Sequence, residues 1–255
     1  MKRLAVLFVL LAFVSADGKV ARRVGMTVAP ATADLLDETF NTAVGYDLTW
    51  TESNGAANIN EDDATNPPVG AVTGFVTQDL KVTQAGSTRS NTWAALSSTK
   101  ASGTVYARFY MYVLGSNIPD AGEYTDIFEL NSPTATAFTD SSSSGPRIIL
   151  KNVAGTLQLE FWVGSGGNAS VKTISAGTGY RVEYAATIGS VGGGVVTISS
   201  YEWKVDGVLI GSGNGTFNDA GNAGIGRVIC GVDQNGNATI YFDTVGVGST
   251  GYIGA

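Results

Sequence analysis

The sequence predicts an all-β protein, an antiparallel two-sheet β-sandwich with jelly-roll connections. Three observations predict this fold class. Short runs alternate apolar and polar residues, Gly, Asn, Asp and Ser separate those runs, and no segment has the periodicity of a helix. Short strands at regular spacing are typical of sandwiches and barrels. The 255 residues suffice for one large β domain with a sizeable core, or for two small domains.

The clearest strand is VYARFYMYV, residues 105–113. Because side chains alternate between the two faces of a strand, its apolar residues, Phe109 among them, face the core. The other face must meet something different from a hydrocarbon core. It carries four residues that we call the tyrosine ladder: Tyr106, Arg108, Tyr110 and Tyr112.

The remaining strands are read from the same alternation and from turn residues. Residues 147–152 and 156–163 form a hairpin, in which Glu160 and Trp162 face away from the core. Residues 180–188 and 196–205 flank a glycine-rich loop, and Asp206-Gly207 is a two-residue hairpin signal that turns the chain into 208–211. Two more strands follow, at 226–232 and 238–247.

Composition excludes several classes of function. The sequence has no histidine, which excludes a Ser-His-Asp triad, a Cys-His pair and any His-ligated zinc site. Its one cysteine, Cys230, cannot form an internal disulfide and lies in an apolar run, where it reads as a small buried hydrophobe. The net charge is −7 with no basic run beyond the N-terminus, so nucleic-acid binding is not expected.

The N-terminus reads as a secretory signal peptide at residues 1–16. Lys2 and Arg3 precede an apolar stretch, and Val14-Ser15-Ala16 forms a small-residue cleavage site. The alternative is an uncleaved anchor or a buried apolar arm. Residues 17–35 include basic residues and no clear periodicity, which predicts a flexible arm, and 36–255 is predicted as the sandwich. We therefore expect a secreted or surface-attached protein.

Several fragments together resemble concanavalin A-like lectin/glucanase sandwiches. They are ETFNTAVGYDLTWTE at 38–52, YRVEY at 180–184, YEWKVDGVLIGSG at 201–213 and YFDTVGVGSTGYIG at 241–254. The laminin-G-like modules of environmental bacterial and viral proteins are the most similar group. The resemblance covers roughly 36–255, and it predicts the fold better than the function, because this fold hosts lectins, glycosidases, lyases, adhesins and virion proteins.

The resemblance implies a concave sheet that often holds a glycan. The tyrosine ladder suits such a surface, because aromatic rings stack on sugar faces while polar side chains bond the hydroxyl groups. We expect the carbohydrate-binding residues to be Tyr106, Arg108, Tyr110, Tyr112, Tyr124, Asp126, Glu160 and Trp162. In related sandwiches a structural calcium can bridge the first and last strands, which here implies Glu38 and Asp243.

The stretch GEYTDIFEL, residues 122–130, resembles the E-x-D-x-x-E signature of family 16 glycoside hydrolases. The resemblance gives Asp126 and Glu129 the second and third roles, but the nucleophile position then falls on Tyr124. Glu123 is one residue too early, and alternation points it away from Asp126. Asp126 and Glu129 share a face only if a β-bulge lies between them. The stretch therefore reads as framework rather than as a catalytic strand.

Three functions follow, in order. The first is a secreted, lectin-like surface module that binds a glycan or polysaccharide without catalysis. The second is a structural or adhesion protein of a virion, filament or cell envelope, which self-assembles or attaches through the N-terminal arm. The third is an enzyme: a family-16-like hydrolase using Glu123, Asp126 and Glu129, or a polysaccharide lyase, for which the tyrosine ladder supplies the residue types.

The first testable prediction concerns processing. We expect cleavage after Ala16 on export, because basic, apolar and small-residue regions follow one another in the order of a signal peptide. Intact-mass analysis of the secreted protein checks this. A mass that includes Met1 would favour the anchor instead.

Overall fold

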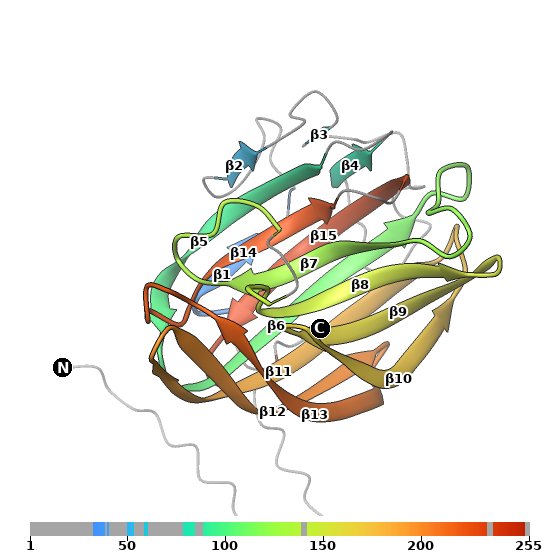
Figure 1. Ribbon diagram of the computed structural model, residues 1–255. Helices are drawn as coiled ribbons and strands as arrows, with labels where there is room; N and C mark the ends of the chain where they lie inside the picture. The colour runs from blue at the N-terminus through green and yellow to red at the C-terminus, as the bar shows by residue number, and fades with distance from the viewer. Residues whose placement is uncertain are drawn as a thin grey trace, which may run out of the picture.

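The protein folds into two antiparallel β-sheets packed face to face, with β-strands as the dominant structure throughout (Figure 1). The computed structural model describes residues 33–38, 40, 50–53, 59–60, 79–84, 89–138, 142–233 and 237–252. These residues contain no helix, and so none that is long and apolar enough to cross a membrane. The predicted two-sheet sandwich is confirmed.

The first sheet has eight strands. They are β1 (Leu36–Glu38), β3 (Ile59–Asn60), β4 (Leu80–Gln84), β6 (Gly103–Val113), β11 (Gly179–Gly192), β12 (Val195–Val205), β13 (Val208–Asn218) and β15 (Ala238–Gly248). Their order in space is β13-β12-β11-β6-β15-β4-β3, and β1 also pairs with β15. The strand that carries the tyrosine ladder, β6, therefore lies in the middle of the sheet.

The second sheet has seven strands. They are β2 (Trp50–Ser53), β5 (Ser90–Lys100), β7 (Tyr124–Asn131), β8 (Pro146–Val153), β9 (Thr156–Val163), β10 (Gly166–Ile174) and β14 (Ile225–Val232). Their order is β10-β9-β8-β7-β14-β5-β2, and β7, β8 and β9 cross the front of the view in Figure 1. The stretch that resembles a glycosidase signature, β7, is central in this sheet.

The core lies between the sheets and uses one face of each strand. Phe109 of β6 stacks on Phe128 of β7, with ring centroids 4.2 Å apart and ring planes 10° from parallel. Phe161 of β9 meets Tyr184 of β11 edge to face at 5.0 Å. Both contacts join the two sheets. Because every strand gives its apolar face to this core, the outer faces are the sheet surfaces left for other chemistry.

The strands agree with the alternation in the sequence. The predicted hairpin at 147–163 is β8 and β9, and the predicted turn at Asp206-Gly207 joins β12 to β13. Asp206 and Gly207 have φ of 51° and 78°, the left-handed values that a two-residue hairpin requires. The sequence analysis did not predict β5 or β10, because serine, threonine, asparagine or glycine interrupts their apolar pattern, and it did not predict the shorter strands β1 to β4.

The sandwich begins slightly before the expected boundary at residue 36. Leu35 is buried, and its backbone N–H donates to Val247 O at 3.0 Å. The Asp34 carboxylate accepts from the Ser249 N–H at 2.6 Å and from the Ser249 hydroxyl at 2.7 Å. These contacts tie the start of the domain to its last strand. The predicted signal peptide, residues 1–16, and residues 17–32 of the predicted arm lie outside the described residues.

The second testable prediction separates core from outer face on β6. Phe109→Ala should lower the free energy of unfolding by about 3–5 kcal/mol, because it empties a fully buried ring site in contact with Phe128 and Phe242. Tyr110→Ala, one residue away on the partly exposed outer face, should cost far less. Urea denaturation followed by tryptophan fluorescence measures both. Equal losses would show that Tyr110 is core packing.

Candidate functional site

The structure divides the eight predicted glycan-binding residues between two surfaces. The tyrosine ladder of β6 lies on the outer face of the eight-stranded sheet, because its neighbours Ala107 and Phe109 face the core. Tyr124 and Asp126 of β7, with Glu160 and Trp162 of β9, lie on the outer face of the seven-stranded sheet. These faces point away from each other across the sandwich. The eight residues therefore do not line one groove.

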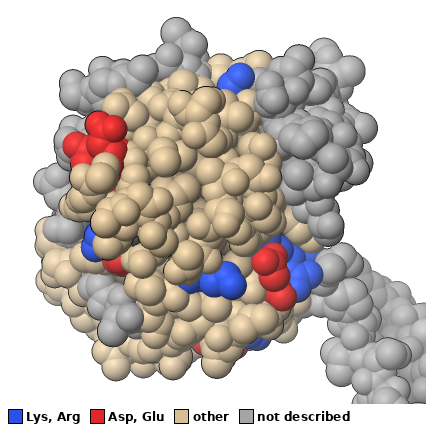
Figure 2. Space-filling view, turned by 90° about the vertical axis from the view of Figure 1, so that its right-hand side faces the viewer, with Lys and Arg blue, Asp and Glu red and all other residues tan. Residues whose placement is uncertain are grey.

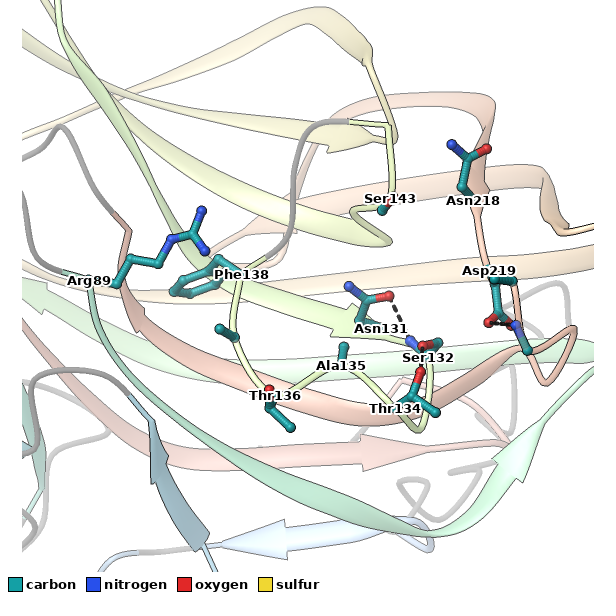
Figure 3. Close-up of a pocket in the computed structure, with 13 residues that line it drawn as sticks. Arg89, Asn131, Ser132, Thr134, Ala135, Thr136, Phe138, Ser143, Asn218 and Asp219 are labelled. Carbon is teal, nitrogen blue, oxygen red and sulfur yellow. Dashed lines mark hydrogen bonds between the residues drawn. The ribbon is translucent and has the colours of Figure 1, made fainter.

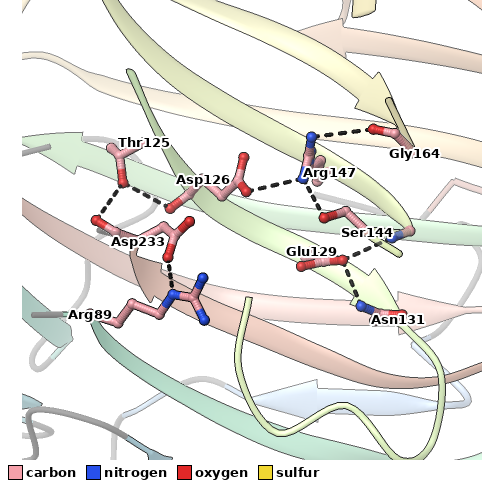
Figure 4. A network of polar contacts seen from close by, with 10 residues as sticks. Arg89, Thr125, Asp126, Glu129, Asn131, Ser144, Arg147, Gly164 and Asp233 are labelled. Atoms are coloured by element: carbon pink, nitrogen blue, oxygen red, sulfur yellow. Dashed lines mark hydrogen bonds and ion pairs between the residues drawn. The ribbon is translucent and has the colours of Figure 1, made fainter. Parts of the chain in front are cut away.

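A β-bulge in β7 puts Asp126 and Glu129 on the same face. The pairing of β7 with β8 shifts between Asp126 and Phe128, so both carboxyl groups face outward, which is the arrangement that the resemblance to the glycosidase signature implied. Glu129 pairs in register with Arg147, whose guanidinium lies 3.1 Å from Asp126 Oδ2 (Figure 4). Glu123 is exposed and precedes the strand, so it does not join this pair.

This buried network fixes the two ends of the β7–β8 loop. Glu129 Oε1 accepts from Asn131 Nδ2 at 2.7 Å and from the Gly145 N–H at 2.8 Å. Arg147 donates to the Ser144 hydroxyl and to Gly164 O, the latter at 3.2 Å. Figure 4 shows these side chains converging on Arg147 and Glu129 from both sides of the loop. These contacts hold the two ends of the loop in place, and we call this buried network the structural staple.

Burial controls the protonation of the two carboxyl groups. Glu129 has no exposed surface and Asp126 has 4%. Burial raises the pKa of Asp126 to about 7, although the Arg147 guanidinium opposes the change. Burial, with the nearby Asp126, raises the pKa of Glu129 well above its usual range. Neither group is presented to solvent, where a glycosidase would need two carboxyl groups flanking a sugar.

The β7–β8 loop covers part of the outer face of β14. Its Phe138 and Ala135 pack on Ile229, and Arg227 donates to Ala135 O at 2.5 Å. A pocket of about 530 Å³ opens between this loop and the segment at Asn218 to Gly221 (Figure 3). Hydroxyl and amide groups dominate its lining, and its one aromatic ring, Phe138, is only 1% exposed. The pocket offers no accessible ring for a sugar.

The two residues expected to hold calcium face opposite sides of the first sheet. Glu38 pairs with the core residue Val245, and its carboxylate accepts from the Phe40 N–H at 2.8 Å and from Trp50 Nε1 at 2.9 Å. Asp243 pairs with Tyr110 of the outer face. No group of three or more His, Cys, Asp or Glu within the described residues is arranged around a metal. A calcium between the first and last strands stays a prediction.

The tyrosine ladder is not uniformly accessible. Tyr106 and Tyr110 are partly exposed, whereas Arg108 and Tyr112 are buried. Tyr112 packs edge to face on Tyr241 of β15 at 5.9 Å, and Arg108 lies 6.0 Å from the Tyr110 ring centroid. Only the two partly exposed tyrosines can stack on a ligand. Each of them borders a hollow in the sheet surface.

The larger hollow, about 460 Å³, crosses β6, β11, β12 and β13. Its floor is a cross-strand row in which Ala185 separates Tyr106 from Glu202, and Glu202 faces Ser212. The small Ala185 side chain leaves space between its neighbours. A second row runs from Thr104 through Thr187 to Ser200. Because cross-strand partners share a face, these rows aim their side chains at one region.

Tyr252, beyond the last strand, forms one wall of the larger hollow. Its ring meets Tyr106 edge to face at 5.3 Å, and Lys204 Nζ lies 3.6 Å from its centroid. Its hydroxyl donates to Glu202 Oε1 at 2.5 Å. Burial, together with this carboxylate, raises the pKa of Tyr252, so the phenol stays a neutral donor.

The smaller hollow, about 380 Å³, is lined by Tyr110, Gly179, Arg181 and Asp206. One of its two charges is paired within the sheet: Arg181 Nε lies 3.2 Å from Glu183 Oε2. The Asp206 carboxylate accepts from the backbone N–H of Arg181 at 2.9 Å.

Sequence reasoning found Tyr106 but missed its partners Glu202, Ser200, Ser212 and Tyr252. Alternation in 196–205 places Glu202 and Lys204 outward, which was an available signal. No signal in the sequence indicated that Tyr252 lies beside Tyr106, because that position depends on how the chain continues after β15.

Comparisons with known proteins give the fold and no family. No family model matches the chain, and no curated protein matches it in sequence. The globular domain of Trypanosoma cruzi calreticulin matches its structure with a TM-score of 0.52 at 10% identity, over 84% of this chain and 87% of that one. Together with the two observed sheets, this similarity supports a concanavalin A-like jelly roll.

Two further solved structures match with lower TM-scores. An endo-β-1,4-glucuronan lyase from Trichoderma reesei has a TM-score of 0.46 at 16% identity, over 80% of this chain and 89% of that one. The receptor-binding domain of a botulinum neurotoxin mosaic serotype has a TM-score of 0.48 at 10% identity. That match covers 88% of this chain but about half, 48%, of the neurotoxin domain.

The third testable prediction concerns the buried carboxyl pair and pH. Both pKa values are raised on folding, so the folded protein holds protons that the unfolded chain releases near pH 4. The pair's contribution to stability is therefore greatest below pH 4 and falls as the pH rises through about 7. Glu129→Gln, which keeps the accepting Oε1, should flatten this dependence and leave the protein at least as stable at pH 8.

Arg147→Met is the matched contrast, because it leaves buried Asp126 without its cation. It should cost roughly 3–5 kcal/mol at pH 8. Denaturation midpoints of the wild-type protein and of both variants, measured from pH 4 to 8, test these expectations. A stability that rises with pH only while Glu129 is present would contradict the assignment.

Proposed function

We propose that this protein is a non-catalytic carbohydrate-binding module and that its site is the outer face of the eight-stranded sheet. The observation that carries this proposal is the hollow between Tyr106 and Tyr252. Two accessible aromatic rings meet there beside a carboxylate and several hydroxyl groups. A sugar presents an apolar face and a rim of hydroxyl groups, and those are the surfaces that this combination matches.

The geometry on the other sheet supports binding without hydrolysis. Asp126 and Glu129 are buried beneath the β7–β8 loop and are committed to Arg147, Asn131 and Gly145. Their role as a staple explains why a glycosidase-like pattern occurs without an accessible carboxyl pair. Tyr124, at the signature's nucleophile position, is exposed and carries no carboxylate.

The charge of the molecule favours neutral ligands over polyanionic ligands. The net charge is −7, and charged residues make up only 15% of the chain. On the face seen in Figure 2, Lys and Arg are few, and some of them lie beside Asp or Glu. A protein with this balance attracts acidic polymers poorly from a distance. Secretion, and attachment through residues 17–35, complete the proposal as a surface module.

The fourth testable prediction identifies the binding face. A glycan array should return at least one ligand, and Tyr106→Ala should weaken its binding about five- to tenfold, because one ring contact contributes about 1 kcal/mol. Tyr124→Ala, an exposed tyrosine of the other sheet, is the matched control and should leave affinity unchanged. Isothermal titration calorimetry measures both.

Unfolding curves of the two variants establish that each retains the fold. If Tyr124→Ala removes binding while Tyr106→Ala does not, the seven-stranded face is the site. If neither variant changes affinity, the aromatic contacts are not part of it. An array with no binding at all would leave the structural-protein alternative.

A further inference from the structure

Glu202 has one carboxylate oxygen engaged and one without a partner. Oε1 accepts from the Tyr252 hydroxyl at 2.5 Å and lies 3.5 Å from Lys204 Nζ. Oε2 has no hydrogen bond to any of the described residues, and the side chain is 44% exposed along the hollow. The two contacts at Oε1 hold the carboxylate in place. Oε2 is left as an oriented acceptor for a ligand.

The groups around Glu202 complete a polar rim. Ser200 and Ser212 line the same hollow, and within the described part of the chain their hydroxyl groups make no hydrogen bond. Thr104 and Thr187 differ, since their hydroxyl groups bond each other at 2.9 Å. The unsatisfied groups therefore gather on the β12 and β13 side, across Ala185 from the Tyr106 ring.

The described residues that line this hollow include no Lys or Arg. Lys204 lies over the Tyr252 ring and against Glu202 Oε1. A ligand carboxylate placed beside Glu202 Oε2 would face that charged oxygen directly, because Lys204 contacts the other oxygen, Oε1. Like charges a few ångströms apart at a protein surface repel enough to change affinity about tenfold. A ligand hydroxyl in the same position would instead donate to Oε2.

We propose that the hollow binds a neutral pyranose residue of a polysaccharide and that Glu202 determines this specificity. One face of the sugar lies against Tyr106, and a hydroxyl group donates to Glu202 Oε2, while Ser200 and Ser212 bond its rim. Glu202 also excludes uronic acids. This inference rests on the proposed function and names the class of its ligand.

The test compares sugars that differ only at C6. β-1,4-glucan and β-1,4-glucuronan hexasaccharides form one matched pair, and β-1,4-mannan and β-1,4-mannuronan hexasaccharides form a second. Affinities are measured by calorimetry in low salt. The wild-type protein should bind the neutral member of at least one pair at least tenfold tighter than its uronate counterpart.

Glu202→Gln keeps an acceptor for Tyr252 and removes the charge. It should reduce the preference to less than threefold, mainly by strengthening uronate binding. Glu123→Gln makes the same charge change at an exposed residue of the other sheet and should leave the preference intact. In the wild-type protein, 0.5 M NaCl should narrow the preference, because salt screens the repulsion.

The outcomes separate the two proposals. If the uronate member binds as tightly as the neutral one, or if Glu202→Gln keeps the full preference while folded, the specificity inference is wrong and glycan binding stands. If neither pair nor any glycan on an array binds, the proposed function itself fails. A preference lost equally in Glu123→Gln would show a general charge effect rather than a role for Glu202.

Discussion

The rest of the structure depends on the commitment of one face of every strand to a shared core. Phe109 and Phe128, stacked 4.2 Å apart, join the central strands β6 and β7 of the two sheets, and alternation then fixes which residues face outward. Polar side chains of the strands that are open to solvent therefore lie on one of two outer faces, whereas Glu38, which faces inward, is fully buried. This constraint separates the tyrosine ladder from Asp126 and Trp162, which are similar candidates in sequence but lie on opposite sides of the sandwich.

The two outer faces differ in how far their polar side chains are exposed to solvent. On the seven-stranded sheet, the bulge in β7 brings Asp126 and Glu129 to one side, where the β7–β8 loop and Arg147 enclose them. Burial raises their pKa values, and one oxygen of each carboxyl group, Asp126 Oδ2 and Glu129 Oε1, accepts hydrogen bonds that anchor the loop. The same carboxyl groups, left open, would suggest catalysis. Burial therefore fits these carboxyl groups to a structural role rather than to catalysis.

On the eight-stranded sheet, the outer face around Tyr106 is open to solvent at the larger hollow. Ala185 leaves a space in the row between Tyr106 and Glu202, and Tyr252 closes one side of it. The contacts of Tyr252 with Tyr106, Lys204 and Glu202 hold several side chains around the hollow in place. In the site that we propose, such preorganisation reduces the entropy lost on binding.

The sequence by itself determined the fold class, most long strands, the turn at Asp206-Gly207 and the outward direction of the tyrosine ladder, because these follow from local alternation and turn chemistry. It also indicated that Asp126 and Glu129 share a face only if a β-bulge lies between them, and the structure has that bulge. Only the tertiary structure decided which outward residues are accessible. Arg108 and Tyr112 are buried, Glu129 lies under a loop, and Tyr252 reaches Tyr106 and Glu202 from distant positions in the chain. The burial of a residue by other segments leaves no local pattern in a sequence, and neither do contacts between residues that are far apart in the chain.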